Sequence, residues 1–170
     1  MNTFSSQFSI DSRLIGDNQP VYIIAEAGVS HFGSEEKAFR LVDLAVDAGA
    51  DAVKFQIFDV DAMISNASED WKRRLSPRQL EYSAFKRIQS YCKSKNITFF
   101  ATAHDQPSLE YLVNLDVPAY KIASFENTHL PLLKKVAATG KPIIISTGMA
   151  TIAEIGDAVK ISNIKLPEGV

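Results

Sequence analysis

The sequence predicts an α/β fold built from repeated βα units. Five short apolar runs alternate with helix-like segments, and each run ends on a polar residue that a buried strand does not ordinarily carry. Because the carboxyl ends of parallel strands meet at one edge of a sheet, we expect these polar residues to gather around one pocket. The five runs are residues 21–26, 52–56, 97–102, 119–124 and 143–147.

The N-terminal part of the chain predicts a hairpin, a strand and a helix. Residues 4–20 alternate weakly between apolar and polar side chains, and they contain the turn signal Gly16-Asp-Asn-Gln-Pro20. This pattern predicts a short β-hairpin. The first strand of the repeated units is expected over residues 21–25. Ser34 is a favourable N-cap for the helix that follows, and Gly49 ends that helix.

The middle of the chain predicts two further units, separated by an unusual connection. A strand is expected at 52–57, and residues 58–76 form a polar connection longer than ordinary βα loops, which is typical of functional or mobile segments. The tetrapeptide Ser76-Pro-Arg-Gln79 predicts a capping box that opens the next helix. A strand at 97–101 and a helix after Asp105 complete this part.

The last third of the chain predicts two more units, which makes five in total. A closed barrel needs eight units in typically about 250 residues. Two arrangements therefore stay open: an open parallel sheet with helices on both faces, or the first part of a longer (β/α)8 barrel. Residues 163–170 are expected to connect toward another strand. The elements of this part are a strand at 119–123, a helix from Thr128 to Gly140, a strand at 142–146 and a helix opened by a capping box of Thr151 and Glu154.

Composition narrows the class of protein. A chain of 170 residues with 46% hydrophobic and 22% charged residues predicts one globular domain over residues 1–170. A net charge of −2 argues against a nucleic-acid or membrane-surface partner. Cys92 is the single cysteine, so no intrachain disulfide forms, and no signal peptide is visible. We therefore expect a cytoplasmic protein.

Two lysines within the apolar strands are the main candidate site residues. Lys54 and Lys121 each have apolar neighbours on both sides. Because alternate residues of a strand face opposite sides, each lysine is expected to face the barrel interior or the sheet crevice. Hydroxyl groups beside such an ammonium favour a phosphate or carboxylate ligand. The alternative is structural: a lysine that extends from a strand end to solvent, or an ion pair with Glu26.

Other polar residues near the strand ends are weaker candidates. Glu126 follows the fourth strand, where a carboxylate is either solvated or functional. Ser146, Thr147 and the glycine after them either bind an anion or form an ordinary turn. His31 and His104 follow strand ends and are possible pocket residues, but no pair of histidines has the spacing of a metal site.

Several motifs occur in an order that resembles one known family. They are Tyr22–Gly28, Ala48–Gln56, Val117–Ser124, His129–Leu133 and Thr139–Met149. In this order they resemble the N-terminal barrel of the sialic acid synthase family, which includes N-acetylneuraminate, legionaminate, pseudaminate and spore-coat relatives. The resemblance covers about residues 8–160. It implies that the chain forms the first five or so units of a (β/α)8 barrel, preceded by an N-terminal hairpin.

The resemblance also implies an activity and a role for each site residue. Members of the family condense phosphoenolpyruvate with an N-acylated amino sugar such as N-acetylmannosamine, and they release phosphate. Glu26 and Glu126 are then catalytic, and the possible pocket residues are Gln56, His31, His104 and Thr147. The residues implied to bind phosphoenolpyruvate are Lys54, Thr102, Lys121, Ser124 and Ser146.

The chain departs from the family pattern on the expected sugar side. The segments Ser30–Gly33, Thr102–Asp105 and Ser124–Glu126 replace the more frequent Asn-His-Asn-Gly, Thr-Pro-Phe-Asp and Ser-Gly-Glu. In the family, later strands supply the histidines for a divalent metal, Mn²⁺ or Mg²⁺, and a C-terminal antifreeze-like domain is swapped in a homodimer. Neither is expected in these 170 residues, so the chain alone is expected to have no metal site and to be inactive.

Two other functions stay open at this point. The first is a Schiff-base aldolase on a similar barrel, with Lys54 or Lys121 as the nucleophile. The second is a non-catalytic fragment that binds a partner chain through exposed strand edges.

Overall fold

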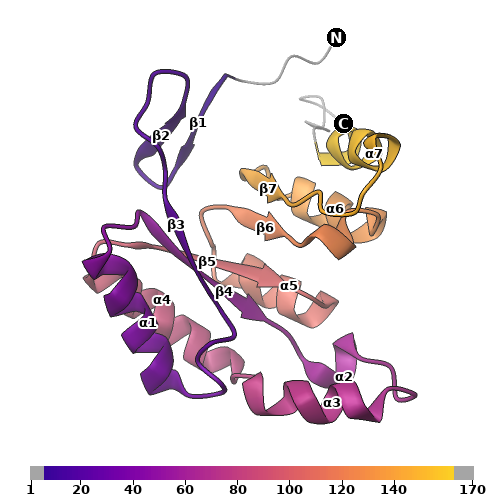
Figure 1. The fold of residues 1–170 in the computed structure, drawn as a ribbon. Coiled ribbons are helices and arrows are strands. Elements are labelled where there is room, and N and C mark those ends of the chain that lie inside the picture. The colour runs from indigo at the N-terminus through magenta and orange to yellow at the C-terminus, as the bar shows by residue number, and fades with distance from the viewer. Residues whose placement is uncertain (1–5, 163–170) are drawn as a thin grey trace. The chain divides into compact units, whose positions relative to one another are not determined.

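The computed structural model describes residues 6–162, and these fall into two compact units. One unit holds the chain up to Val21 together with the chain from Pro118 onward, and the other is Tyr22–Val117. Each unit is an arrangement of α-helices and β-strands (Figure 1). The expectation of a single domain over residues 1–170 stays a prediction.

The unit Tyr22–Val117 contains a parallel three-stranded sheet in the order β3-β4-β5. Helices α1 and α4 pack against each other and lie side by side in Figure 1. Two short helices, α2 and α3, lie between β4 and α4. The elements are β3 (Ile24–Gly28), α1 (Glu35–Asp47), β4 (Ala52–Ile57), α2 (Val60–Met63), α3 (Glu69–Leu75), α4 (Tyr82–Ser94), β5 (Thr98–Ala103) and α5 (Gln106–Asn114).

The core of this unit lies on the helix side of the sheet. Phe55 on β4 is fully buried, and its ring stacks on that of Phe99 on β5 at 6.1 Å between centroids. Cys92 on α4 is also fully buried, and burial raises the pKa of its thiol to about 12. It therefore acts as a small apolar core residue, as expected.

The first strand begins three residues later than the sequence pattern predicts. Its ladder with β4 starts at Ile24, which pairs with Ala52, and shifts register between Glu26 and Gly28. The Ala52 N–H at the start of β4 donates to the carbonyl oxygen of Ile23 at 3.1 Å, so the bonding between the two strands begins there. As a result Glu26 lies within the strand, directly opposite Lys54.

The long connection 58–76 is partly helical, and the predicted capping box at its end does not open a helix of the α type. Ser76 begins a short 3-10 helix, η1 (Ser76–Arg78), and α4 begins only at Tyr82. The Ser76 hydroxyl donates to the carbonyl oxygen of Lys72 at 2.7 Å. The Gln79 side-chain oxygen accepts from the N–H of Val60 at 2.9 Å. Both side chains of the predicted box are therefore engaged with the preceding helices.

The other unit contains two small sheets. The strands β1 and β2 form the predicted antiparallel hairpin, and residues 4 and 5 of the predicted range lie outside the described residues. The strands β6 and β7 are parallel, and α6 packs against α7. The elements are β1 (Gln7–Ile10), β2 (Arg13–Gly16), β6 (Tyr120–Ile122), η2 (Ser124–Glu126), α6 (Leu130–Ala137), β7 (Ile143–Ile145) and α7 (Ile152–Ser162).

The described residues confirm an α/β protein with five parallel-type βα units. The two N-terminal caps at Ser34 and Thr151 are also confirmed: Ser34 accepts from the N–H of Lys37 at 3.2 Å, and Thr151 exchanges bonds with Glu154. The predicted connection at 163–170 lies outside the described residues. None of the described helices is both long and apolar enough to cross a membrane.

Candidate functional site

Lys54 is held at the centre of the three-stranded sheet with polar partners on both neighbouring strands. Its ammonium lies 2.9 Å from Glu26 Oε2 on β3 and donates to Thr102 Oγ1 on β5 at 3.3 Å. The lysine side chain is 7% exposed, whereas that of Glu26 is 59% exposed. A buried charge is stabilised by such partners, so the site presents a compensated ammonium whose counter-charge faces solvent. These three predicted site residues are thus brought together.

The same face of the sheet continues toward the carboxyl ends of the strands. Gln56 is half-buried and lies opposite Thr102 in the register between β4 and β5. His104 follows β5, and its ring lies 6.5 Å from that of Phe58, between centroids. Gln56 and His104 were predicted from the sequence as possible pocket residues, whereas Phe58 was not.

His31 does not join Lys54, Glu26 and Thr102. Its ring lies 6.1 Å from that of Phe55, which alternates with Lys54 on β4 and so faces the opposite side of the sheet. Nδ1 accepts the N–H of Gly33 at 3.1 Å, which leaves the proton on Nε2. The residue is fully buried, and this burial lowers the pKa of the imidazole to about 4. His31 is therefore neutral and contributes to the packing of the core.

A second lysine cluster lies in the unit that contains β6 and β7. Lys121 Nζ donates to Ser146 Oγ at 2.5 Å and to the carbonyl oxygen of Ile122 at 3.1 Å. The Ser146 N–H donates in turn to the Ile122 carbonyl oxygen at 3.1 Å, which fixes the loop after β7. A Cβ added at Gly148 would lie 3.6 Å from Ser124 Oγ, so this serine faces the same loop.

The remaining predicted residues of this unit differ in exposure. Thr147 is exposed, and its carbonyl oxygen accepts from the N–H of Ala150 in the turn after β7. Glu126 is buried in η2, where its N–H donates to the carbonyl oxygen of Ala123 at 3.1 Å. The structure thus groups Lys121, Ser124 and Ser146 around one loop.

Asp105 connects the strand ends near His104, a role that was not predicted from the sequence. Its carboxylate accepts from the N–H of Ser108 at 2.7 Å, as the cap of α5, and from the N–H of Asp59 at 2.7 Å. The Ser108 hydroxyl donates to the same carboxylate at 2.9 Å. One side chain therefore links the segments that follow β4 and β5. An aspartate just before a helix was the available signal, but its second partner is distant in sequence.

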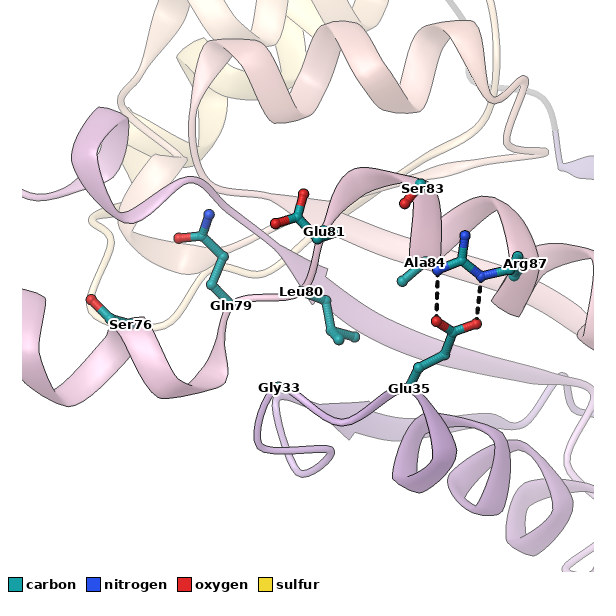
Figure 2. A pocket seen from close by; sticks show the side chains of 9 residues that line it. All are labelled: Gly33, Glu35, Ser76, Gln79, Leu80, Glu81, Ser83, Ala84 and Arg87. Carbon is teal, nitrogen blue, oxygen red and sulfur yellow. Dashed lines mark hydrogen bonds and ion pairs between the residues drawn. The ribbon is translucent and has the colours of Figure 1, made fainter.

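A hollow of about 430 Å³ lies beside the N-terminal ends of α1 and α4 (Figure 2). Glu35 and Arg87 face each other there through two bonds of 2.6 and 2.7 Å, and this pairing lowers the pKa of Glu35. None of the predicted site residues lines the hollow. Its lining is Gly33, Glu35, Ser76, Gln79, Leu80, Glu81, Ser83, Ala84 and Arg87.

Comparison with known proteins assigns the family. The model of the NeuB family matches residues 41–168. The chain belongs to the NeuB family. The predicted family is thereby confirmed.

Individual NeuB relatives extend the match. The chain is 39% identical over 164 residues to the spore coat polysaccharide biosynthesis protein SpsE of Bacillus subtilis, a match that covers 89% of this chain and 43% of that protein. It is 38% identical to the N,N'-diacetyllegionaminic acid synthase of Campylobacter jejuni, with 82% and 46% covered. This NeuB chain thus spans less than half the length of these two relatives.

A solved structure agrees with the NeuB assignment. The N-acetylneuraminic acid synthetase of Leptospira borgpetersenii, crystallised with citrate, superposes with a TM-score of 0.88 at 35% identity. The match covers 93% of this chain and 55% of that one.

Proposed function

We propose that this NeuB chain is part of an enzyme that condenses phosphoenolpyruvate with an N-acylated amino sugar to give a nonulosonic acid. The observation that carries the proposal is the pair of lysine clusters. In each cluster, a lysine on a strand donates to a hydroxyl group near the carboxyl end of the neighbouring strand. Lys54 donates to Thr102, and Lys121 donates to Ser146. Ammonium and hydroxyl donors suit the phosphate and the carboxylate of phosphoenolpyruvate.

We further propose that the chain forms the first part of a (β/α)8 barrel. The support is the succession of five βα units and the short span of the chain within its relatives. In such a barrel, active sites occupy the carboxyl ends of the strands. The full-length protein is proposed to be a homodimer with small-molecule substrates.

The proposed reaction forms one C–C bond and breaks one C–O bond. The enol C3 of phosphoenolpyruvate attacks the aldehyde carbon of the sugar, and the aldehyde oxygen takes up a proton to become a hydroxyl group. Water adds at C2, and inorganic phosphate leaves from that carbon to give the keto acid. Lys54, Thr102, Lys121, Ser124 and Ser146 bind the anionic groups in this proposal. In this proposal Glu26 and Glu126 contact the sugar and transfer protons.

A divalent metal, Mn²⁺ or Mg²⁺, is proposed for the full-length enzyme. The described residues 6–162 contain no group of three or more His, Cys, Asp or Glu side chains that could hold a metal ion. These residues therefore do not fit a metal site. We propose that they bind the phosphoenolpyruvate anion.

The contacts of Lys54 speak against the aldolase alternative for that residue. A Schiff base needs a free amine lone pair, whereas Lys54 Nζ is engaged with the Glu26 carboxylate and the Thr102 hydroxyl. Borohydride trapping of a lysine adduct with a keto acid would favour the aldolase instead.

Calorimetric titration with phosphoenolpyruvate tests the proposal directly. We expect the unmodified protein to bind, and we expect Lys54→Met and Lys121→Met each to weaken binding by about tenfold or more, since a charge-assisted bond contributes about 1.5–3 kcal/mol. Lys93→Met, which changes an exposed lysine on α4, is the matched control and should bind normally. Unchanged affinity in both site variants would refute the assignment of the anion site.

A further inference from the structure

Phe58 and His104 continue the face of the sheet that carries Lys54. The ladder between β4 and β5 pairs Ile57 with Ala103, and the His104 N–H extends it by donating to the Ile57 carbonyl oxygen at 3.1 Å. The next pair in this register is Phe58 and His104, whose rings lie 6.5 Å apart with 43° between their planes. His104 comes two positions after Thr102, so alternation places both on the same face.

The two rings lie beyond the ammonium group, past the carboxyl ends of β4 and β5. A strand rises by about 3.3 Å per residue, so His104 lies about 7 Å past Thr102 along β5. Phe58 is 3% exposed, whereas His104 is half-buried. His104 is therefore partly accessible to solvent, and the phenyl ring of Phe58 lies beside its imidazole.

The backbone beneath this pair is fixed by Asp105. The carboxylate bonds the N–H of Asp59, the residue after Phe58, and Asp105 itself follows His104. Phe58 thus precedes Asp59 and His104 precedes Asp105, and these two aspartates are joined by a hydrogen bond. Groups whose backbone is held in this way can discriminate between ligands, because they do not move to accommodate a poor fit.

We propose that His104 contacts the acceptor sugar and determines which sugar is used. This inference rests on the proposed function, in which the Lys54 cluster holds the anionic reactant. The second reactant then lies farther along the strands, at the level of His104. The ring nitrogens of an imidazole can form hydrogen bonds with a hydroxyl or acylamino group, and the phenyl ring beside it suits the apolar side of a sugar.

The test compares steady-state kinetics of the complete gene product that carries this sequence with those of its His104→Phe and His104→Gln variants. N-acetylmannosamine, its 6-phosphate and a 2,4-diacetamido sugar serve as acceptors. We expect His104→Phe to raise the KM of the preferred acceptor by about tenfold, which corresponds to one lost hydrogen bond. The KM of phosphoenolpyruvate should stay within about twofold. His104→Gln keeps a donor and an acceptor and should recover most of the loss.

Control measurements separate this inference from the function on which it rests. His129→Phe makes the same change at an exposed histidine and should leave both KM values unaltered. Turnover with an unchanged acceptor KM and an unchanged order of preference in His104→Phe would overturn this inference alone. Absence of turnover by the unmodified protein with every acceptor would overturn the proposed function as well. A rise in both KM values together would also overturn the inference, because it indicates a general disturbance of the site.

Discussion

The buried, neutral His31 predicts a defined loss of stability in acid. The imidazole is fully buried, and Nε2 has no hydrogen-bond partner among the described residues. Burial disfavours the charged form, which lowers the pKa from 6.5 to about 4 in the folded protein. Between these two values the unfolded chain binds a proton at this position and the folded chain does not. Stability from this residue is therefore complete above pH 6.5 and is lost as the pH falls toward 4.

The magnitude follows from the difference between the two pKa values. One pKa unit corresponds to about 1.36 kcal/mol, so a shift from 6.5 to about 4 gives about 3 kcal/mol at the acid limit. Linkage gives about 1.4 kcal/mol of this loss at pH 5.5 and about 2.5 kcal/mol at pH 4.5. These losses are large beside the roughly 5–15 kcal/mol that stabilise a typical domain.

Urea unfolding followed by circular dichroism from pH 7.5 to pH 4.5 measures the effect. The comparison is with His31→Asn, whose side-chain oxygen can replace Nδ1 as the acceptor of the Gly33 N–H but does not titrate. All other titrating groups are common to both proteins, so the difference in unfolding free energy isolates His31. We expect that difference to shrink by about 2.5 kcal/mol on going to pH 4.5. A difference that stays constant across this range would show that His31 is not held neutral by burial.

Two further predictions concern caps and links. Ser34→Ala removes the acceptor for the Lys37 N–H at the start of α1 and should lower the unfolding free energy by about 1 kcal/mol in urea titrations; no change would mean that the cap is replaced by solvent. Asp105→Ala removes the cap of α5 and also leaves the Asp59 N–H without its acceptor. We expect a loss of about 2–4 kcal/mol, clearly larger than that for Ser34→Ala, and equal losses would contradict the linking role of Asp105.

Local sequence signals predicted the helix caps where the capping side chain and the N–H that it accepts lie close in the chain. Ser34 and Thr151 cap helices as expected, because each bonds a residue three positions later. Ser76 and Gln79 have the same spacing, yet Gln79 instead bonds Val60, nineteen positions earlier. A competing partner from another part of the fold thus overrides a local motif that looks equally strong.

The site was predictable to the extent that it follows from strand alternation. A period of two brings Lys54 and Thr102 to one face once the register of β4 and β5 is set. His31 was not predictable in this way, because it lies after a strand, where the path of the loop decides. Positive φ angles of 49° at Phe32 and 73° at Gly33 shape the turn after His31, whose ring packs against Phe55. Such turns depend on loop geometry that periodicity does not encode.

The unequal exposure of Lys54 and Glu26 bears on how the proposed anion site would work. The lysine is nearly inaccessible and is held by two strands, whereas its partner carboxylate is 59% exposed. An arriving anion would therefore meet an ammonium that is already in position, while Glu26 has the freedom to turn toward solvent or toward a second reactant. The ion pair stabilises the buried charge before the ligand binds, since an uncompensated ammonium at this depth would be strongly destabilising. The Glu26 carboxylate can thus stabilise the buried Lys54 ammonium in the folded protein. In the proposed reaction it can then turn away from Lys54 when the anionic ligand takes its place.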